Sequence, residues 1–164
     1  MMSSRRTPQE QRLWAPWRIT YVQQGGSAGC IFCRKPREHQ DARNHIVTRK
    51  KLVYSLLNIY PYNNGHVMVA PFRHVGEIEK LTIPEQRELL ALVTETVRIL
   101  KKSLKPQGFN IGMNIGRMAG AGFDRHLHVH IVPRWKGDTN FMPVVAETKV
   151  ISQSLNELYR MLKS

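Results

Sequence analysis

The sequence has few features that would place the protein in a membrane or outside the cell. No apolar run approaches the roughly 20 residues that a membrane-spanning helix needs. The first 18 residues are basic but lack the apolar core and the small-residue cleavage site of a secretory signal. We therefore expect a cytoplasmic protein with no membrane-spanning segment.

Cysteine is scarce as well: the only two, Cys30 and Cys33, stand together in the sequence CIFC. In a reducing compartment such a pair binds metal or does redox chemistry more often than it forms a structural disulfide. Redox pairs usually open a helix after a strand, whereas Arg34, Lys35 and Pro36 indicate a loop. The sequence therefore favours metal binding.

Acidic residues are outnumbered by basic ones: 12 Asp and Glu stand against 25 Lys and Arg, giving a formal net charge of +13. A surplus of this size favours a polyanionic partner such as a nucleotide, a nucleic acid or an anionic membrane. Solubility alone explains it equally well. The 164 residues, 41% of them hydrophobic, fit one domain that buries roughly 70% of its unfolded surface.

The first half of the chain reads as an arm followed by strands. Residues 1–29 are polar and basic and end in a Gly-rich hinge, so we expect an N-terminal arm anchored by Trp14 and Trp17. Two apolar runs within 45–58 and another at 65–71 flank a turn. This pattern predicts an antiparallel meander.

Two helices are expected further along the chain. The stretch 81–105 carries an apolar stripe at helical spacing, and Thr82 with Glu85 forms a capping box at its start. A second amphipathic stretch at 152–163 predicts a C-terminal helix. Between them, 109–116 predicts another strand, which leads into a Gly-rich loop.

Three histidines alternate with apolar residues in the sequence HLHVHIV. Because side chains alternate between the faces of a strand, His126, His128 and His130 share one face. A neutral imidazole nitrogen serves as nucleophile, general base or metal ligand. These residues alone leave two interpretations open, a His-rich metal site or covalent catalysis by a histidine with supporting histidines.

The preceding loop, GRMAGAG, suggests that the partner of these histidines is a phosphate. Its flexible backbone N–H groups can form an anion-binding nest, and Arg117, Arg125 and Arg134 are close in sequence. The loop is neither a P-loop nor a Rossmann fingerprint.

The motif HLHVHIV resembles that of the histidine triad (HIT) superfamily of nucleotide hydrolases and transferases. The segments SLLNIYPYNNGHVMVAPFRH and GMNIG resemble the elements that precede the triad in that family, with Asn58 eight residues before His66. LWAPWR, GRMAGAG and HLHVHIVPRWKGDTNFMPV are similar to the Fhit-like branch that contains bacterial diadenosine tetraphosphate phosphorylases. The resemblance implies an α+β HIT fold over 30–164: an antiparallel sheet of about five strands, one long helix and a C-terminal helix, paired as a homodimer.

The resemblance also implies roles for the histidines. His128 matches the nucleophile that attacks the α-phosphate of a dinucleoside polyphosphate and forms a nucleotidyl-histidine intermediate. For attack through one ring nitrogen, the other must be held as N–H by an acceptor, for which we expect a local backbone carbonyl. His66 and His130 match groups that orient the phosphate.

Nucleotide contacts follow from the same resemblance. Asn58 matches a ribose-binding position and Asn114 a phosphate-binding position. Trp135 is a further ligand contact, although ordinary packing of an aromatic side chain explains it equally well. The loop contacts would come from Gly120, Ala121 and Gly122.

In zinc-containing HIT proteins, a pair of cysteines and two histidines hold the metal. The matching residues here are Cys30, Cys33, His74 and His126. Two thiolates and two imidazoles are an ordinary tetrahedral zinc set, and with no open position the zinc would be structural.

One departure concerns the acceptor of the nucleotidyl group. The phosphorylase-like branch tends to carry a serine after the small residues of the loop, where this chain has Ala121 and Gly122. Phosphate and water are therefore both candidate acceptors. An adenylyl phosphoramidase and a basic, zinc-containing nucleic-acid-binding protein are the alternative functions.

Overall fold

A single antiparallel sheet organises the part of the chain that the computed structural model describes, residues 29–138, 151 and 153–163. The strands lie in the order β1-β2-β3-β5-β4, and each pair of neighbours is antiparallel. Their bounds are Ile46–Arg49 (β1), Val53–Leu57 (β2), Val67–Pro71 (β3), Gly108–Gly112 (β4) and Val129–Arg134 (β5). The α+β fold and the meander of the first three strands are confirmed.

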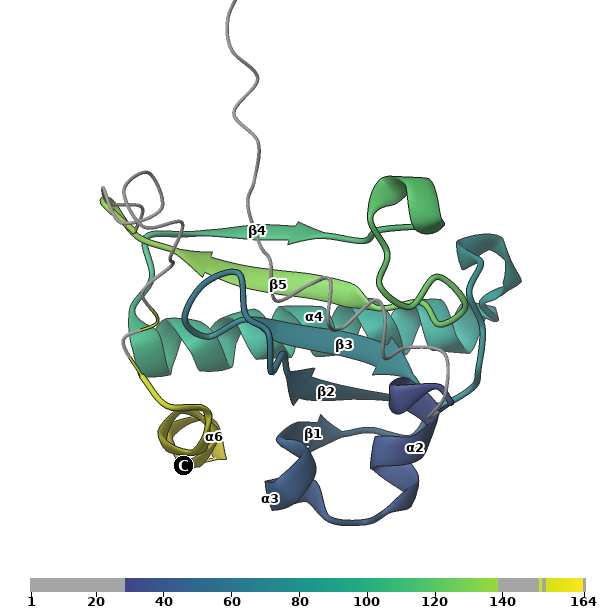
Figure 1. The fold of residues 1–164 in the computed structure, drawn as a ribbon, viewed down its shortest axis with the longest axis horizontal. Coiled ribbons are helices and arrows are strands. Elements are labelled where there is room, and N and C mark those ends of the chain that lie inside the picture. Colours follow the sequence, from purple (N-terminus) through teal and green to yellow (C-terminus); the bar gives the residue numbers. More distant parts are fainter. Residues whose placement is uncertain (1–28, 139–150, 152, 164) are drawn as a thin grey trace, which may run out of the picture.

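Helices lie on both sides of this sheet (Figure 1). The α-helices are α2 (Ile31–Arg37), α3 (Asp41–Asn44), α4 (Ile83–Leu104) and α6 (Leu155–Lys163). Single turns of 3-10 helix are η1 (Ile78–Lys80) and η2 (Arg117–Ala119). Within the described residues, none of these helices combines the length and the apolar character that crossing a bilayer requires.

The long helix α4 covers one face of the sheet, behind the strands in Figure 1. The expected capping box is present, since the Thr82 hydroxyl accepts from the Glu85 N–H and the Glu85 carboxylate accepts from the Thr82 N–H at 2.8 Å. The apolar stripe of α4 packs against inward residues of β2, β3 and β5. The C-terminal helix α6 joins this core through Leu158 and Leu162, as its periodicity predicts.

The opposite face of the sheet carries a smaller apolar cluster. It consists of Phe32 from α2 together with Ile46, Tyr54, Leu56, Met68 and Ala70 from the first three strands. Because strand side chains alternate, Leu56 and Met68 lie in this cluster while their neighbours Leu57 and Val67 lie in the α4 core. This second face is the one on which the histidines lie.

The helix α2 corrects the loop expected after the cysteine pair. Pro36 lies inside α2 and has no N–H to donate to the carbonyl of Phe32. The hydroxyl of Tyr54 donates to that carbonyl instead, at 2.7 Å, so the missing helical hydrogen bond is replaced from the sheet. Cys30 therefore precedes a helix and Cys33 lies within it, so the predicted loop was wrong and does not count against redox chemistry.

Two other expectations need adjustment. The strand expected over 109–116 ends at Gly112, because the chain turns away from the sheet and reaches Gly116 in a positive-φ conformation (φ 79°). The predicted N-terminal arm with Trp14 and Trp17 lies outside the described residues, except for its last residue.

Candidate active site

The alternation predicted for the three histidines is present in the structure. His130 lies in β5, whereas His126 and His128 lie in the extended chain just before it. The backbone leaves the ladder there because the Leu127 N–H donates to the carbonyl of Val75 at 2.6 Å. The intervening apolar side chains all point into the α4 core: Leu127, Val129 and Ile131. The three imidazoles consequently share the opposite side of the chain.

His128 is held in one tautomer. Its Nδ1 lies 2.8 Å from the carbonyl oxygen of His126, and only an N–H can be a partner for that acceptor. The lone pair of the neutral ring is therefore on Nε2. Burial lowers the pKa of His128, so the ring is neutral at physiological pH. The backbone-carbonyl acceptor expected from the sequence is thus present, and it comes from the histidine two residues earlier.

His66, immediately before β3, is linked to His130 on the neighbouring strand β5. The backbone N–H of Tyr62 donates to His66 Nδ1 at 3.1 Å, so the proton of a neutral His66 is on Nε2. His66 Nε2 lies 2.9 Å from His130 Nδ1 and donates to it. His130 Nδ1 is then the acceptor, and its Nε2 carries the proton. A chain of fixed tautomers therefore makes His130 a hydrogen-bond donor.

A pocket opens beside these rings. It is lined by Asn58, Tyr60, Tyr62, Met68, Asn114, Gly120, Gly122, His128 and His130. The structure therefore brings Asn58 and Asn114 to the same cavity as His128, as the sequence motif implies. Ala121 and Trp135 do not line this pocket; the Trp135 N–H faces Asp138 Oδ2 at 3.3 Å beyond the end of β5. The nucleotide-binding roles of Ala121 and Trp135 stay predictions.

Sequence reasoning missed three aromatic residues at the site. Tyr60 and Tyr62 line the pocket, and the ring of Tyr62 stacks on that of His66 with centroids 4.8 Å apart. Phe32 stacks on His128. The two tyrosines, separated by one proline in the turn before His66, were the available signal, because tyrosine suits a site where an apolar ring and a polar hydroxyl both find partners.

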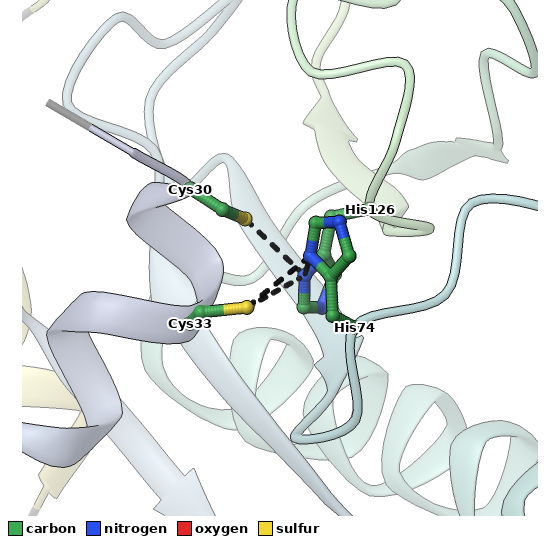
Figure 2. A group of neighbouring side chains, drawn as sticks. All are labelled: Cys30, Cys33, His74 and His126. Carbon is green, nitrogen blue, oxygen red and sulfur yellow. Dashed lines mark hydrogen bonds between the residues drawn. The ribbon is translucent and has the colours of Figure 1, made fainter. Parts of the chain in front are cut away.

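A second cluster, the Cys/His cluster, lies next to the triad and consists of Cys30, Cys33, His74 and His126. Their potential ligand atoms all lie within 4.8 Å of one another. Cys33 Sγ is 3.3 Å from His74 Nδ1, Cys30 Sγ is 3.3 Å from His126 Nδ1, and the two Nδ1 atoms are 3.3 Å apart. Figure 2 shows the two sulfur atoms directed at the two imidazole rings.

These spacings fit a tetrahedral metal ion. With Zn–N near 2.0–2.1 Å and Zn–S near 2.3 Å, tetrahedral geometry separates two nitrogens by about 3.4 Å and a nitrogen from a sulfur by about 3.6 Å. His126 Nε2 lies 2.9 Å from the Pro71 carbonyl, so its proton is there and the Nδ1 lone pair faces the cluster. Burial lowers the pKa of His126 to about 4, which keeps the ring neutral, the form that binds metal. The donor set therefore fits a metal site.

A family model matches the part of the chain that forms the sheet and carries the three histidines. The HIT domain model matches residues 39–137, which include all five strands, α4 and the three histidines. The chain belongs to the HIT family.

One relative and one solved structure extend the match beyond that domain, and a second relative matches a shorter part of the chain. A protein of Mycobacterium tuberculosis named AP-4-A phosphorylase is 43% identical over 163 residues, covering 94% of this chain and 83% of the relative. An asymmetrical bis(5'-nucleosyl)-tetraphosphatase of Schizosaccharomyces pombe is 35% identical over 95 residues, covering 58% of this chain and 52% of the relative. The structure of a Zn-bound histidine triad family protein from Mycobacterium smegmatis superimposes with a TM-score of 0.67 at 26% identity, covering 84% of this chain and 93% of the other.

Proposed function

We propose that this protein cleaves dinucleoside polyphosphates of the diadenosine tetraphosphate type at an α-phosphate, through a nucleotidyl intermediate on His128. The observation that carries the proposal is the hydrogen bond from His128 Nδ1 to the His126 carbonyl, because it leaves Nε2 as a nucleophile beside the pocket. The names of the M. tuberculosis and S. pombe relatives support this class of substrate.

In the first step, His128 Nε2 attacks the α-phosphorus and the bond from phosphorus to the α–β bridging oxygen breaks. With diadenosine tetraphosphate the products are an adenylyl-histidine and ATP. The adenylylated ring keeps its Nδ1 proton and becomes positively charged. The His126 carbonyl, 2.8 Å away, stabilises that charge by accepting the proton's hydrogen bond. His130 donates to the phosphate from Nε2, and Asn114 contributes its side-chain amide.

In the second step, an acceptor oxygen attacks the same phosphorus and the bond to Nε2 breaks. Inorganic phosphate as the acceptor gives ADP, whereas water gives AMP. The 43% identity to a protein named AP-4-A phosphorylase supports phosphate. In this chain Ala121 and Gly122 stand where the branch tends to carry a serine, and Gly122 lines the pocket.

The test is incubation of the purified protein with diadenosine tetraphosphate, with and without inorganic phosphate, while ATP, ADP and AMP are resolved. ATP with ADP only when phosphate is present identifies a phosphorylase, and ATP with AMP identifies a hydrolase. His128→Ala should abolish both while the fold is retained; His45→Ala, which removes an imidazole outside the pocket, is the matched control. Full activity of His128→Ala contradicts the proposal, and cleavage of adenosine phosphoramidate alone favours the phosphoramidase.

Zinc is the metal that this proposal assigns to the Cys/His cluster. Cys30, Cys33, His74 and His126 would hold it, and four protein ligands leave no position for a substrate, so its contribution is structural. The tetrahedral spacing of the donors and the Zn-bound family member from M. smegmatis support this assignment.

The proposal also includes a homodimer. β4 is an edge strand of the described sheet, and Ile111 on it is 49% exposed, which supports pairing with a second copy. Light scattering during size-exclusion chromatography measures the mass directly. Nucleic-acid binding and a cytoplasmic location stay predictions.

A further inference from the structure

Phe32 is the residue of α2 that packs directly on the nucleophile. Its ring is stacked on that of His128, with centroids 4.6 Å apart and planes inclined by 26°. The same ring lies 5.2 Å from that of His126. Phe32 is fully buried and does not line the pocket beside His128.

The position of Phe32 is itself fixed from several directions. Its carbonyl accepts from the Tyr54 hydroxyl at 2.7 Å, and the ring of Phe123 meets it edge-on at 5.9 Å. Cys33, the next residue, and Cys30, two residues before, belong to the Cys/His cluster. The Phe32 ring is therefore a rigid surface for His128 to lie against.

Two constraints are needed to aim an imidazole nitrogen. The hydrogen bond to the His126 carbonyl fixes where Nδ1 lies, but a single hydrogen bond permits the ring to tilt about it. A flat aromatic surface against one face of the ring removes that tilt. The two constraints together determine the direction in which Nε2 points.

We propose that Phe32 is a positioning residue for His128: its stacked ring holds the imidazole in the orientation for attack. The effect on rate rests on the proposed function, whereas the effect on the orientation of the His128 ring does not. Since Cys30 and Cys33 flank Phe32, the same short segment both builds the Cys/His cluster and orients the nucleophile.

The kinetic test compares Phe32→Leu, which removes the flat surface, with Phe32→Tyr, which keeps it. We expect Phe32→Leu to lower kcat by about 10- to 100-fold, because small misplacement of a reacting atom has effects of this size. KM should stay within about twofold, as expected when substrate binding is unchanged. Phe32→Tyr should recover most of the loss. Ile46→Val, in the same apolar cluster but on β1, which is separated from β5 by two strands, is the control for core packing.

A second measurement needs no substrate. Nitrogen-15 spectra of the imidazole rings report which nitrogen carries the proton. We expect the Nδ1–H tautomer of His128 in the wild type. In Phe32→Leu the His126 carbonyl should keep this tautomer, but the Nε2 signal should broaden because the ring tilts. Tyr54→Phe removes the hydrogen bond that holds the Phe32 carbonyl, and a smaller change in the same direction is expected. This variant keeps the test available if Phe32→Leu does not fold.

The outcomes separate the inference from the proposed function. A wild type without activity, but with the expected broadening of the His128 Nε2 signal in the variants, rejects the function and supports the positioning role. Equal kcat and unchanged spectra in Phe32→Leu and Ile46→Val overturn the positioning role. A raised KM with unchanged kcat also overturns it, because Phe32 would then act on substrate binding.

Discussion

His66 Nε2 lies 2.9 Å from His130 Nδ1; His66 immediately precedes β3, and His130 lies in the adjacent strand β5. Because the Tyr62 N–H occupies His66 Nδ1, the contact has a direction: His66 donates and His130 accepts. His130 therefore presents an Nε2–H donor to the pocket, which suits an anionic phosphate.

This direction leads to a prediction about His66 variants. A glutamine amide reaches as far as His66 Nε2 and keeps a donor for His130, whereas an asparagine amide reaches only as far as Nδ1. His66→Gln should therefore keep more activity than His66→Asn, by about tenfold in kcat, the scale of one positioned hydrogen bond. Steady-state cleavage of diadenosine tetraphosphate measures the difference. Equal activity of the two variants would show that donation to His130 is unimportant.

Metal removal should affect stability more than substrate affinity. The Cys/His cluster joins α2, the loop after β3 and the chain before β5, so a bound ion stabilises the native state relative to the unfolded chain. We expect about one zinc per chain in the purified protein and a lower Tm after treatment with a chelator, restored by added Zn²⁺. Elemental analysis and thermal unfolding check both points. Cys33→Ser should lose the metal; retention of stoichiometric zinc in that variant would rule out the assigned ligands.

Glu85 gives the fold a predictable response to acid. The Arg73 guanidinium hydrogen-bonded to it, with further donors from Thr82, lowers the pKa of Glu85 to about 2. Its ionised form is favoured in the folded state, so its stabilisation is complete above about pH 4.5 and is lost as the pH falls towards 2.

Glu85→Gln should accordingly be less stable at pH 7 by about 1–2 kcal/mol, a value that allows for screening because Arg73 is half exposed. The difference from the wild type should shrink between pH 4.5 and pH 2.5. Urea unfolding across this range measures it. A constant difference at every pH would mean that the carboxylate charge does not contribute.

Gly65 is required by the turn that presents His66. Its φ is +75°, and a Cβ there would lie 2.5 Å from Leu104 Cδ1 and 3.0 Å from Pro133 Cγ. Gly65→Ala should destabilise the fold by about 2–4 kcal/mol, from backbone strain and overpacking together. Gly108→Ala, where a Cβ meets nothing within 4 Å, is the matched control. Similar urea midpoints for the two variants would contradict this account.

Local patterns in the sequence predicted the elements that depend on local physics. The alternation of HLHVHIV placed three imidazoles on one face, because the period of an extended chain does not depend on the rest of the fold. The capping box of Thr82 and Glu85 likewise needs only residues of its own turn. The helix α2 was missed because its stability depends on Tyr54, which lies on a distant strand.

The candidate site also has residues that the sequence predicted and residues that it did not. The family motif identified Asn58, Asn114 and the donors of the Cys/His cluster, and the fold brings each set together. The sequence predicted that a local backbone carbonyl would accept from His128, but not that this carbonyl would be the one of His126. The stacking of Phe32 on His128 was not predicted, since a phenylalanine between two cysteines gives no sign of which distant ring it will meet.

The pairing of Pro36 with the Tyr54 hydroxyl has an evolutionary consequence. A proline in α2 is tolerated because a side chain from β2 supplies the donor that the proline lacks. A homologue with any other residue at position 36 supplies that donor from its own backbone, and phenylalanine at position 54 then carries no penalty. The two positions are therefore expected to covary across the family: a hydroxyl at 54 should accompany proline at 36, and should drift to phenylalanine where that proline is absent.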